Sequence, residues 1–166
     1  IDDYKHLPAL INEKCDVFFH IAWQATGGRE VRNTQIFQQS QNIGYVLEAL
    51  SAAKEIGCKK FIGAGSQAEF GVLNLDKIAP DSPANPVQPY GIAKYAAGKL
   101  ARAQAAIWGI DCLWVRIFSV YGIYDRPSAM VSSTIATLMR GEKPLFTPAE
   151  QRWDYLYDAD AGRAFC

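Results

Sequence analysis

Apolar residues in this sequence follow two patterns, short continuous runs and longer stretches with helical spacing. The continuous runs are "CDVFFHIAW" at 15–23, "KKFIGAGS" at 59–66 and "DCLWVRIFSVYG" at 111–122. Their unbroken apolar character and β-forming residues predict strands buried on both faces of a parallel sheet. The stretches with helical spacing are 33–56, 89–108 and 128–140. Repeats of three and four residues over such lengths predict helices.

Glycine and proline support the boundaries of these predicted helices. Gly57, Gly109 and Gly141 follow the three stretches, at the place where a left-handed residue commonly ends a helix. Pro89 stands in the first turn of the second helix, where a missing N–H costs little. The proline-containing segment 67–88 is predicted to be a long irregular loop, and such loops in compact domains are often functional.

Strands and helices alternate along the chain, which is the order typical of α/β proteins. We therefore expect an α/β fold, a parallel sheet flanked by helices with right-handed crossovers, in a single domain over residues 1–166. The two end segments are less regular. Residues 4–12 predict a short helix interrupted by Pro8, and residues 151–165 predict a strand or turn that leads into a helix.

Composition and charge narrow the classes of partner. Hydrophobic residues make up 49% and charged residues 20%, as in ordinary globular proteins. Lysine plus arginine equals aspartate plus glutamate, at 17 each, so no nucleic-acid partner is expected. The apolar runs are too short to span a bilayer, so no membrane partner is expected either. The four cysteines form no CxxC and the two histidines have no metal-binding spacing, which predicts no metal site and reduced thiols in a cytoplasmic protein.

Side chains capable of chemistry or ligand contact follow each predicted strand. They are Ala22 and Trp23 after the first strand, Ser66 after the second, and Phe118, Ser119 and Tyr121 after the third. Ligands of open parallel sheets bind at the carboxyl ends of the strands, so we expect a site at this edge. His20, by contrast, is expected to be a hydrogen-bonded residue at a strand end rather than a catalyst.

The helix predicted at 89–108 carries two tyrosine–lysine pairs of equal spacing. Tyr90 precedes Lys94 by four residues, and Tyr95 precedes Lys99 by four. Four helical steps place two partners on one face, whereas the two pairs point about 140° apart. Only one pair can therefore face Ser66. Tyr90 and Lys94 lie in the first turns, next to the long loop, so this pair is expected at the site and the second pair at the periphery.

A serine, a tyrosine and a lysine brought together can move a proton. A tyrosine hydroxyl has a pKa of about 10, and lowering it to about 7 requires about 4 kcal/mol. A lysine ammonium about 4 Å away supplies energy of that order at an effective dielectric of about 20. Tyr90 would then exchange a proton with an alcohol or ketone while hydride moves to or from a nicotinamide. The alternative is a helix-surface pair worth a few tenths of a kcal/mol.

Several motifs in fixed order resemble the extended short-chain dehydrogenase/reductase family, in its NAD-dependent epimerase/dehydratase group. They are "VFFHIAW", "NIGYVLEALSAAKEIGCKKFIGAGSQAEFG", "PYGIAKYAAGK", "VRIFSVYG" and "RWDYLYDADAGRAF". The resemblance implies a Rossmann-like fold, NAD or NADP as cofactor and a nucleotide-sugar substrate. It also implies a homodimer formed through the helices at 33–56 and 89–108.

The resemblance also implies roles for individual residues. It assigns catalysis to Ser66, Tyr90 and Lys94. It assigns cofactor contacts to Ala22, Trp23, Tyr90, Lys94 and Phe118. It assigns substrate contacts to Gln67, Ser119, Tyr121 and Arg152. Family members often have an arginine where this sequence has Trp153, with Arg152 one residue earlier, and an asparagine where it has Ser119.

Two departures from the family pattern restrict what the chain is expected to do. The dinucleotide fingerprint GxxGxxG is absent, so we expect a partial chain without the N-terminal βαβ units and the C-terminal substrate part. On its own it should bind NAD poorly. Family dehydratases carry Asp-Glu directly after the catalytic residue, where this sequence has Gln67 and Ala68. A nucleotide-sugar 4-epimerase or ketoreductase is therefore favoured, and a non-catalytic nucleotide-binding or scaffold relative is the alternative.

Overall fold

The structure is a computed structural model that describes residues 1, 3–148, 150 and 153–166. Its contacts divide the chain into two compact units, Ile1–Ile117 and Phe118–Cys166, and each is described by itself.

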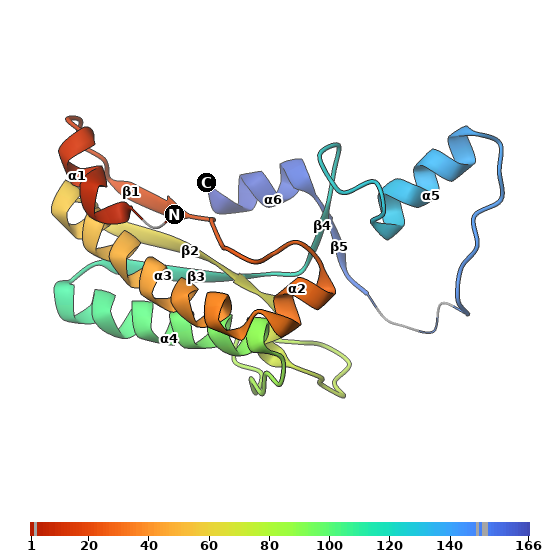
Figure 1. The fold of residues 1–166 in the computed structure, drawn as a ribbon, viewed down its shortest axis with the longest axis horizontal. Coiled ribbons are helices and arrows are strands. Elements are labelled where there is room, and N and C mark those ends of the chain that lie inside the picture. Colours follow the sequence, from red (N-terminus) through yellow and green to blue (C-terminus); the bar gives the residue numbers. More distant parts are fainter. Residues whose placement is uncertain (2, 149, 151–152) are drawn as a thin grey trace. The chain divides into compact units, whose positions relative to one another are not determined.

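A parallel sheet forms the centre of the first unit. Its strands within the described residues are β1 (Val17–His20), β2 (Lys60–Ser66) and β3 (Asp111–Ile117), in the order β1-β2-β3 (Figure 1). The predicted strand positions are confirmed for the first two runs. The third run is not one strand: β3 ends at Ile117, and Ser119–Tyr121 forms a separate strand, β4, in the second unit. The single strand predicted over 111–122 is therefore wrong.

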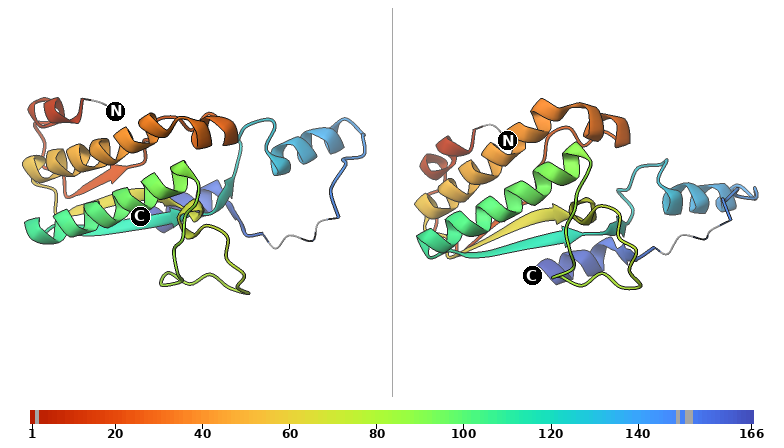
Figure 2. Two further views of the ribbon diagram at one scale, coloured as in Figure 1. Left: turned by 60° about the horizontal axis from the view of Figure 1, so that its bottom comes forward. Right: turned by 90° about the horizontal axis from the view of Figure 1, so that it is seen from below.

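Two long helices lie side by side over one face of this sheet, α3 (Ile36–Ile56) and α4 (Pro89–Trp108) (Figure 2). Both end at the predicted glycines, which take left-handed conformations with φ of 90° and 69°. The helix predicted from residue 33 is interrupted, because Gln35 has a non-helical backbone (φ −86°, ψ 65°) that separates α2 (Arg29–Thr34) from α3. Shorter elements complete this unit: η1 (Tyr4–His6), α1 (Leu7–Leu10) and η2 (Gln67–Phe70).

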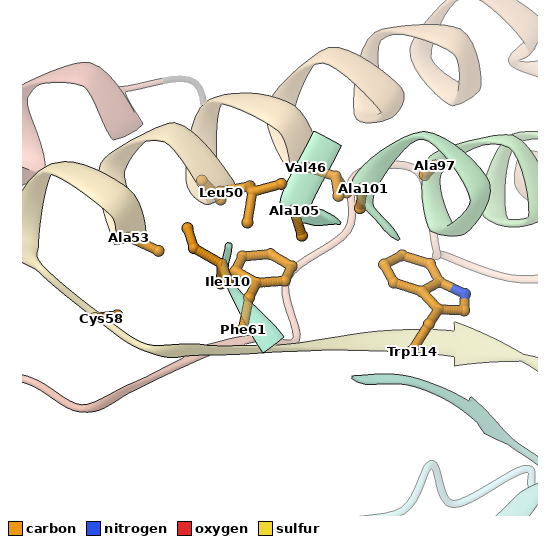
Figure 3. Packing of buried hydrophobic residues seen from close by; sticks show 11 residues of the cluster. Val46, Leu50, Ala53, Cys58, Phe61, Ala97, Ala101, Ala105, Ile110 and Trp114 are labelled. Atoms are coloured by element: carbon orange, nitrogen blue, oxygen red, sulfur yellow. The ribbon is translucent and has the colours of Figure 1, made fainter. Parts of the chain in front are cut away.

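The core of the first unit lies between α3, α4 and the sheet (Figure 3). Helix α4 contributes a stripe of small residues, Ala97, Ala101 and Ala105, all with no exposed surface. Small side chains at four-residue spacing let α3 and the sheet approach the helix closely. Phe61 on β2, also fully buried, fills the space beneath, while α3 supplies Val46, Ala49, Leu50 and Ala53.

The Trp114 indole of β3 fits between the sheet and α4 because glycine occupies the positions around it. A Cβ built on Gly63 or Gly65 of β2 would overlap the indole, and one on Gly98 of α4 would lie 2.5 Å from its Nε1. These glycines therefore create the volume that the indole fills. Since Trp114 is also hydrogen-bonded, its position is fixed by packing and by polar contact together.

The second unit contains β4 (Ser119–Tyr121) beside β5 (Tyr155–Tyr157) in parallel, together with α5 (Met130–Met139) and α6 (Asp158–Phe165). The helix predicted at 128–140 and the strand leading into a helix near 151–165 are thereby confirmed, with slightly shorter bounds. The Tyr121 ring packs against those of Tyr155 and Tyr157, at centroid distances of 6.4 and 5.6 Å.

Candidate active site

Tyr90 reaches the carboxyl end of β2 because α4 begins there. Pro89 opens the helix in its first turn, as expected, and Gly91 lies so close to η2 that an added Cβ would overlap the Ala68 carbonyl oxygen. This close approach places the Tyr90 side chain near Ser66, the last residue of β2, and the Ser66 side chain acts to lower the pKa of Tyr90. The predicted proximity of Ser66 and Tyr90 is therefore present in the structure.

The hydroxyl of Tyr90 is a neutral phenol in this structure. Burial raises its pKa above the ordinary value of 10.0, while hydrogen bonding to Ser66 and the charge of Arg32 act to lower it, and Glu69 acts to raise it.

Lys94 is almost fully buried, with 3% of its surface exposed. Its Nζ donates to the Ala64 carbonyl oxygen at 2.6 Å and lies 3.8 Å from the centre of the Trp23 ring, whereas it is 5.9 Å from the centre of the Tyr90 ring. Burial lowers the Lys94 pKa to about 7, against an opposing influence of Glu69. Near neutral pH this lysine is therefore poised between its charged and neutral forms.

Two fully buried side-chain amides of α3 are hydrogen-bonded to the loop that follows β1. Gln39 accepts from the Trp23 indole Nε1 at 2.8 Å and donates to the Ala25 carbonyl oxygen at 3.0 Å. Asn42 accepts from the Gln24 backbone N–H at 2.8 Å. These bonds hold the Trp23 ring against Lys94, and its edge against the Tyr90 ring at a centroid distance of 6.1 Å. The sequence places Gln39 in a helix but does not reveal this role.

A buried carboxylate, Glu69, lies directly behind Ser66 and was not among the predicted site residues. Only 1% of Glu69 is exposed; its Oε1 accepts from the Ser66 backbone N–H at 2.8 Å and from the Trp114 indole at 2.9 Å. Its Oε2 pairs with Arg116 Nε at 2.9 Å, and Arg116 donates onward to the Pro80 carbonyl oxygen. The S-x-x-E spacing from Ser66 is a capping-box signal from which this carboxylate could have been found.

Arg32 is a second residue that the sequence does not point to. It lies on the short helix α2 with its guanidinium carbon 5.4 Å from the centre of the Tyr90 ring, and its Nε donates to the Gly28 carbonyl oxygen at 3.2 Å. Because α2 and α4 are far apart in the sequence, no motif relates Arg32 to Tyr90. The structure thus adds a cation next to the tyrosine.

His20 ends β1 as expected, but within the described residues one of its two ring nitrogens lacks the expected hydrogen bond. It is 3% exposed, and its Nε2 has no hydrogen-bond partner among the described residues. Burial and the nearby Lys94 lower the His20 pKa to about 4, so the ring is neutral around pH 7. It packs between the Tyr4 and Phe61 rings and therefore serves the core of the first unit.

The remaining predicted site residues have different positions. Ala22 is exposed at the end of β1, and Gln67 is half-buried and opens η2. Ser119 accepts a hydrogen bond from the Trp153 indole at 2.6 Å within the second unit. Phe118 begins that unit and Tyr121 lies on β4, while Arg152 lies outside the described residues.

The second pair on α4 differs from the first in its surroundings. Lys99 is exposed, Tyr95 is half-buried, and the ammonium lies 5.5 Å from the centre of its partner's ring. Among the hydrogen bonds of the described residues, neither Tyr95 nor Lys99 contacts Ser66, Tyr90 or Lys94. The first pair, together with Ser66 and Trp23, therefore makes the candidate active site.

Within the described residues, no helix combines the length and apolar character needed to cross a membrane. In the same part of the chain, no cluster of three or more His, Cys, Asp or Glu side chains is arranged to hold a metal ion.

Comparison with known proteins agrees with the fold. Its curated relatives include a protein named putative UDP-glucose 4-epimerase from Methanocaldococcus jannaschii, 26% identical over 96% of this chain and 54% of its own length. Among solved structures, the UDP-glucose 4-epimerase of Thermotoga maritima with UDP-glucose superimposes with a TM-score of 0.80 at 26% identity, over 98% of this chain and 55% of that one. MoeE5 in complex with UDP-glucuronic acid and NAD gives a TM-score of 0.80 at 27% identity, over 96% of this chain and 53% of that one.

These similarities confirm the Rossmann-like α/β fold expected from the sequence, and the chain spans about half the length of the relatives that it matches. The family itself is identified by a match along the whole chain. The sequence model of the NAD dependent epimerase/dehydratase family matches residues 1–166, and the chain belongs to that family.

Proposed function

We propose that this chain carries the proton-transfer part of an NAD(P)-dependent nucleotide-sugar 4-epimerase or ketoreductase. The observation that carries this proposal is the placement of Tyr90 beside Ser66 at the carboxyl end of β2, with Lys94 buried behind it. Ligands of open parallel sheets bind at this edge. Relatives with solved structures bind UDP-glucose, or UDP-glucuronic acid together with NAD, which supports a nucleotide sugar as substrate.

Tyr90 moves the proton in this mechanism. In the reducing direction its neutral phenol donates the proton to a substrate ketone oxygen, while the Ser66 hydroxyl holds the same oxygen in place. In the oxidising direction the phenolate accepts the proton of a substrate hydroxyl. The raised pKa of Tyr90 suits the donating role at neutral pH, because the hydroxyl keeps its proton until it is needed.

The residues present fit the nicotinamide end of a cofactor. Lys94 has three N–H donors, and the Ala64 carbonyl oxygen takes one of them, which leaves donors for ribose hydroxyls. Trp23 and Ala22 are proposed to line the cofactor. When bound, the nicotinamide takes up and returns the hydride, and its oxidised ring adds positive charge near Tyr90.

Dehydration is the less supported reaction for this site, although one similar protein is named dTDP-glucose 4,6-dehydratase, from Streptomyces niveus. Water elimination needs an acid and a base besides the tyrosine, and Gln67 and Ala68 supply neither. The nearby carboxylate of Glu69 is buried and already bonded to Ser66, Trp114 and Arg116. It is therefore held as a structural anion rather than offered to a substrate.

Two copies of the chain are proposed to pair through α3 and α4. Leu50 on α3 lies in the core with no exposed surface, whereas Phe37 on α3 is 83% exposed and Ile92 on α4 is 48% exposed. These side chains leave apolar surface on both helices. Sedimentation at micromolar concentration should give a dimer, and a monomer would contradict this part of the proposal.

The experiment that tests the reaction compares cofactor use by the intact protein. An epimerase should purify with bound nicotinamide and interconvert UDP-glucose or UDP-glucuronic acid with its 4-epimer without net cofactor consumption. A ketoreductase should oxidise NADH or NADPH in proportion to an added 4-keto sugar nucleotide. If the protein shows neither behaviour with NAD or with NADP, the proposed reaction is excluded and the non-catalytic alternative is favoured.

A further inference from the structure

The buried carboxylate behind the candidate site has no part in the proposed reaction. Glu69 is 1% exposed, and its Oε1 accepts from the Ser66 backbone N–H at 2.8 Å and from the Trp114 indole at 2.9 Å. Its Oε2 accepts from Arg116 Nε at 2.9 Å. Burying a carboxylate is costly unless donors surround it in this way. Donors from two neighbouring strands, β2 and β3, therefore hold Glu69 in one place.

The backbone next to this carboxylate leaves room for it. A Cβ built on Gly65 of β2 would lie 2.5 Å from Glu69 Oε1 and 2.5 Å from Trp114 Nε1. Any other residue at this position would push both groups away from the place where they meet. The glycine that precedes Ser66 therefore makes the space in which the carboxylate reaches the serine.

The carboxylate also determines how Ser66 ends β2. Glu69 bonds the backbone N–H of Ser66, and Ser66 Oγ accepts in return from the Ala68 N–H at 3.2 Å, which completes a capping box. One lone pair of the hydroxyl oxygen is thus occupied within the chain, and the O–H remains as a donor. This donor is the group that holds the substrate oxygen in the proposed reaction. Fixing the backbone and the oxygen of Ser66 restricts the direction of that donor.

The ion pair of Glu69 extends to the long loop at 71–88. Arg116 also donates to the Pro80 carbonyl oxygen at 2.9 Å, and its guanidinium carbon lies 4.6 Å from the centre of the Phe70 ring. The cation that compensates Glu69 is therefore held by the loop as well. Glu69 thus connects Ser66 to this loop through a single ion pair.

We propose that Glu69 is a positioning residue that acts through Ser66: its buried carboxylate holds the serine backbone and so keeps the serine hydroxyl directed at the substrate oxygen. In this role the carboxylate gains and loses no proton and touches no reactant. The inference rests on the proposed function for the reaction, whereas the bond between Glu69 and Ser66 is independent of turnover.

Two double variants separate this bond from the charge of Glu69. Glu69→Gln/Arg116→Met and Glu69→Met/Arg116→Met both remove the ion pair without leaving an unpaired buried charge, an exchange that proteins often tolerate. The Glu69 charge acts to raise the pKa of Tyr90 and of Lys94, and this influence is absent from both doubles alike. The doubles differ because glutamine keeps an oxygen that accepts from the Ser66 N–H, whereas methionine offers only a weakly accepting sulfur.

Hydrogen exchange followed by NMR measures the bond in the intact protein. The Ser66 amide should exchange about tenfold more slowly in the glutamine double than in the methionine double, because only the glutamine holds it. Glu55→Gln, at an exposed position on α3, is the control and should leave exchange at Ser66 as in the unmodified protein. Equal exchange at Ser66 in the two folded doubles would overturn the inference.

Activity in the presence and absence of the Ser66 hydroxyl distinguishes positioning from a general loss of structure. With Ser66 intact, kcat of the methionine double should be about tenfold below that of the glutamine double, because a misdirected donor stabilises the reacting oxygen less. In the Ser66→Ala background the two doubles should have equal kcat, since the hydroxyl is gone. A tenfold difference that persists in Ser66→Ala would refute the proposal.

The exchange measurement also separates the inference from the reaction. Slower exchange of the Ser66 amide in the glutamine double, in a protein that turns over no sugar nucleotide, would support the contact and count against the proposed reaction alone. If the methionine double does not fold, Glu69→Asp replaces it, because aspartate keeps the charge but is one methylene too short to reach Ser66. Exchange at Ser66 as slow in Glu69→Asp as in the unmodified protein would then refute the proposal.

Discussion

Helix α4 carries two tyrosine–lysine pairs of identical spacing in opposite environments. Lys94 is 3% exposed, bonded to the backbone of β2 and stacked on Trp23, whereas Lys99 is exposed to solvent beside Tyr95. The distances from ammonium to ring centre within the pairs are similar, at 5.9 and 5.5 Å. Spacing within a helix therefore determines which two side chains lie on one face, but not whether that face is buried or exposed to solvent.

The face of the helix makes the difference. Lys94 shares its face with Gly98 and Ala101, which pack against Trp114 and the core, because four-residue steps return to the same side of a helix. Lys99 lies on the side turned to solvent. Burial removes water from the first pair and so changes its ionisation.

The largest expected difference between the pairs is in activity. Tyr90→Phe removes the hydroxyl that moves the proton and should lower kcat of the proposed reaction by about 10²- to 10⁴-fold. Tyr95→Phe removes the same atom from the outer pair and should change kcat less than about twofold. Steady-state assays of both variants in the intact protein give the comparison. Equal activities would remove Tyr90 from the mechanism.

The second difference is in the pH dependence of stability. In the folded chain the pKa of Lys94 is about 7 instead of the ordinary 10.5. Between these values the unfolded chain holds a proton that the folded chain has lost, so the free energy of unfolding rises with pH. Below about pH 7 both states are protonated and the cost of burying the ammonium is fully present. Above the ordinary pKa both are neutral and the cost is absent.

Lys94→Met should remove this pH dependence. From about pH 7 to about pH 9 the free energy of unfolding of the unmodified protein should gain about 2 kcal/mol relative to Lys94→Met. Denaturant titration at the two pH values measures it. Lys99→Met, at the exposed pair, serves as the control and should track the unmodified protein at both. If the free energy of unfolding of Lys94→Met changes with pH as that of the unmodified protein does, the buried ammonium keeps an ordinary affinity for its proton.

The third difference is in tolerance of added volume. Gly98→Ala should lower the free energy of unfolding by about 2 kcal/mol, because the new Cβ would lie 2.5 Å from Trp114 Nε1. Gly44→Ala on α3 is the matched change, since nothing lies within 4 Å of its added Cβ. It should stabilise the helix by about 0.5–1 kcal/mol. Thermal unfolding of the two variants should therefore shift in opposite directions, and a stabilised Gly98→Ala would show that the indole can move away.

The smallest expected effect belongs to the outer pair itself. Lys99→Met removes the cation–π contact of this pair, and Tyr95→Phe keeps the ring and loses only the hydroxyl, so each change should cost less than about 1 kcal/mol. Denaturant midpoints should stay close to those of the unmodified protein. A loss of several kcal/mol in either variant would instead assign the outer pair to an interface, and sedimentation of the same variant would distinguish an interface from the interior.

Much of the framework follows from local pattern. The runs that become β1 and β2, the two long helices and the glycines that end them were all predictable from periodicity and backbone preference. The interruption at Gln35 was not, because no glycine or proline marks it. The division of 111–122 into β3 and β4 was hidden too, since an unbroken apolar run carries no signal for a change of sheet.

The residues of the candidate site likewise include some that were predictable from the sequence and some that were not. Ser66, Tyr90 and Lys94 were predictable because strand ends and helical spacing relate them. Glu69 was predictable in part, from its three-residue distance to Ser66. Arg32 was not, because its contact with Tyr90 depends on how α2 lies against α4.

The sequence by itself therefore determined the α/β order, the family and the residues able to move a proton. It also limited the Tyr–Lys pairs to two candidates on one helix. Only the tertiary structure decided that Lys94 is buried against Ala64 and Trp23, and that the Arg32 guanidinium lies near the Tyr90 ring. The physical reason is that helical spacing is a local property, whereas desolvation and charge proximity arise from residues that the chain brings together over long separations.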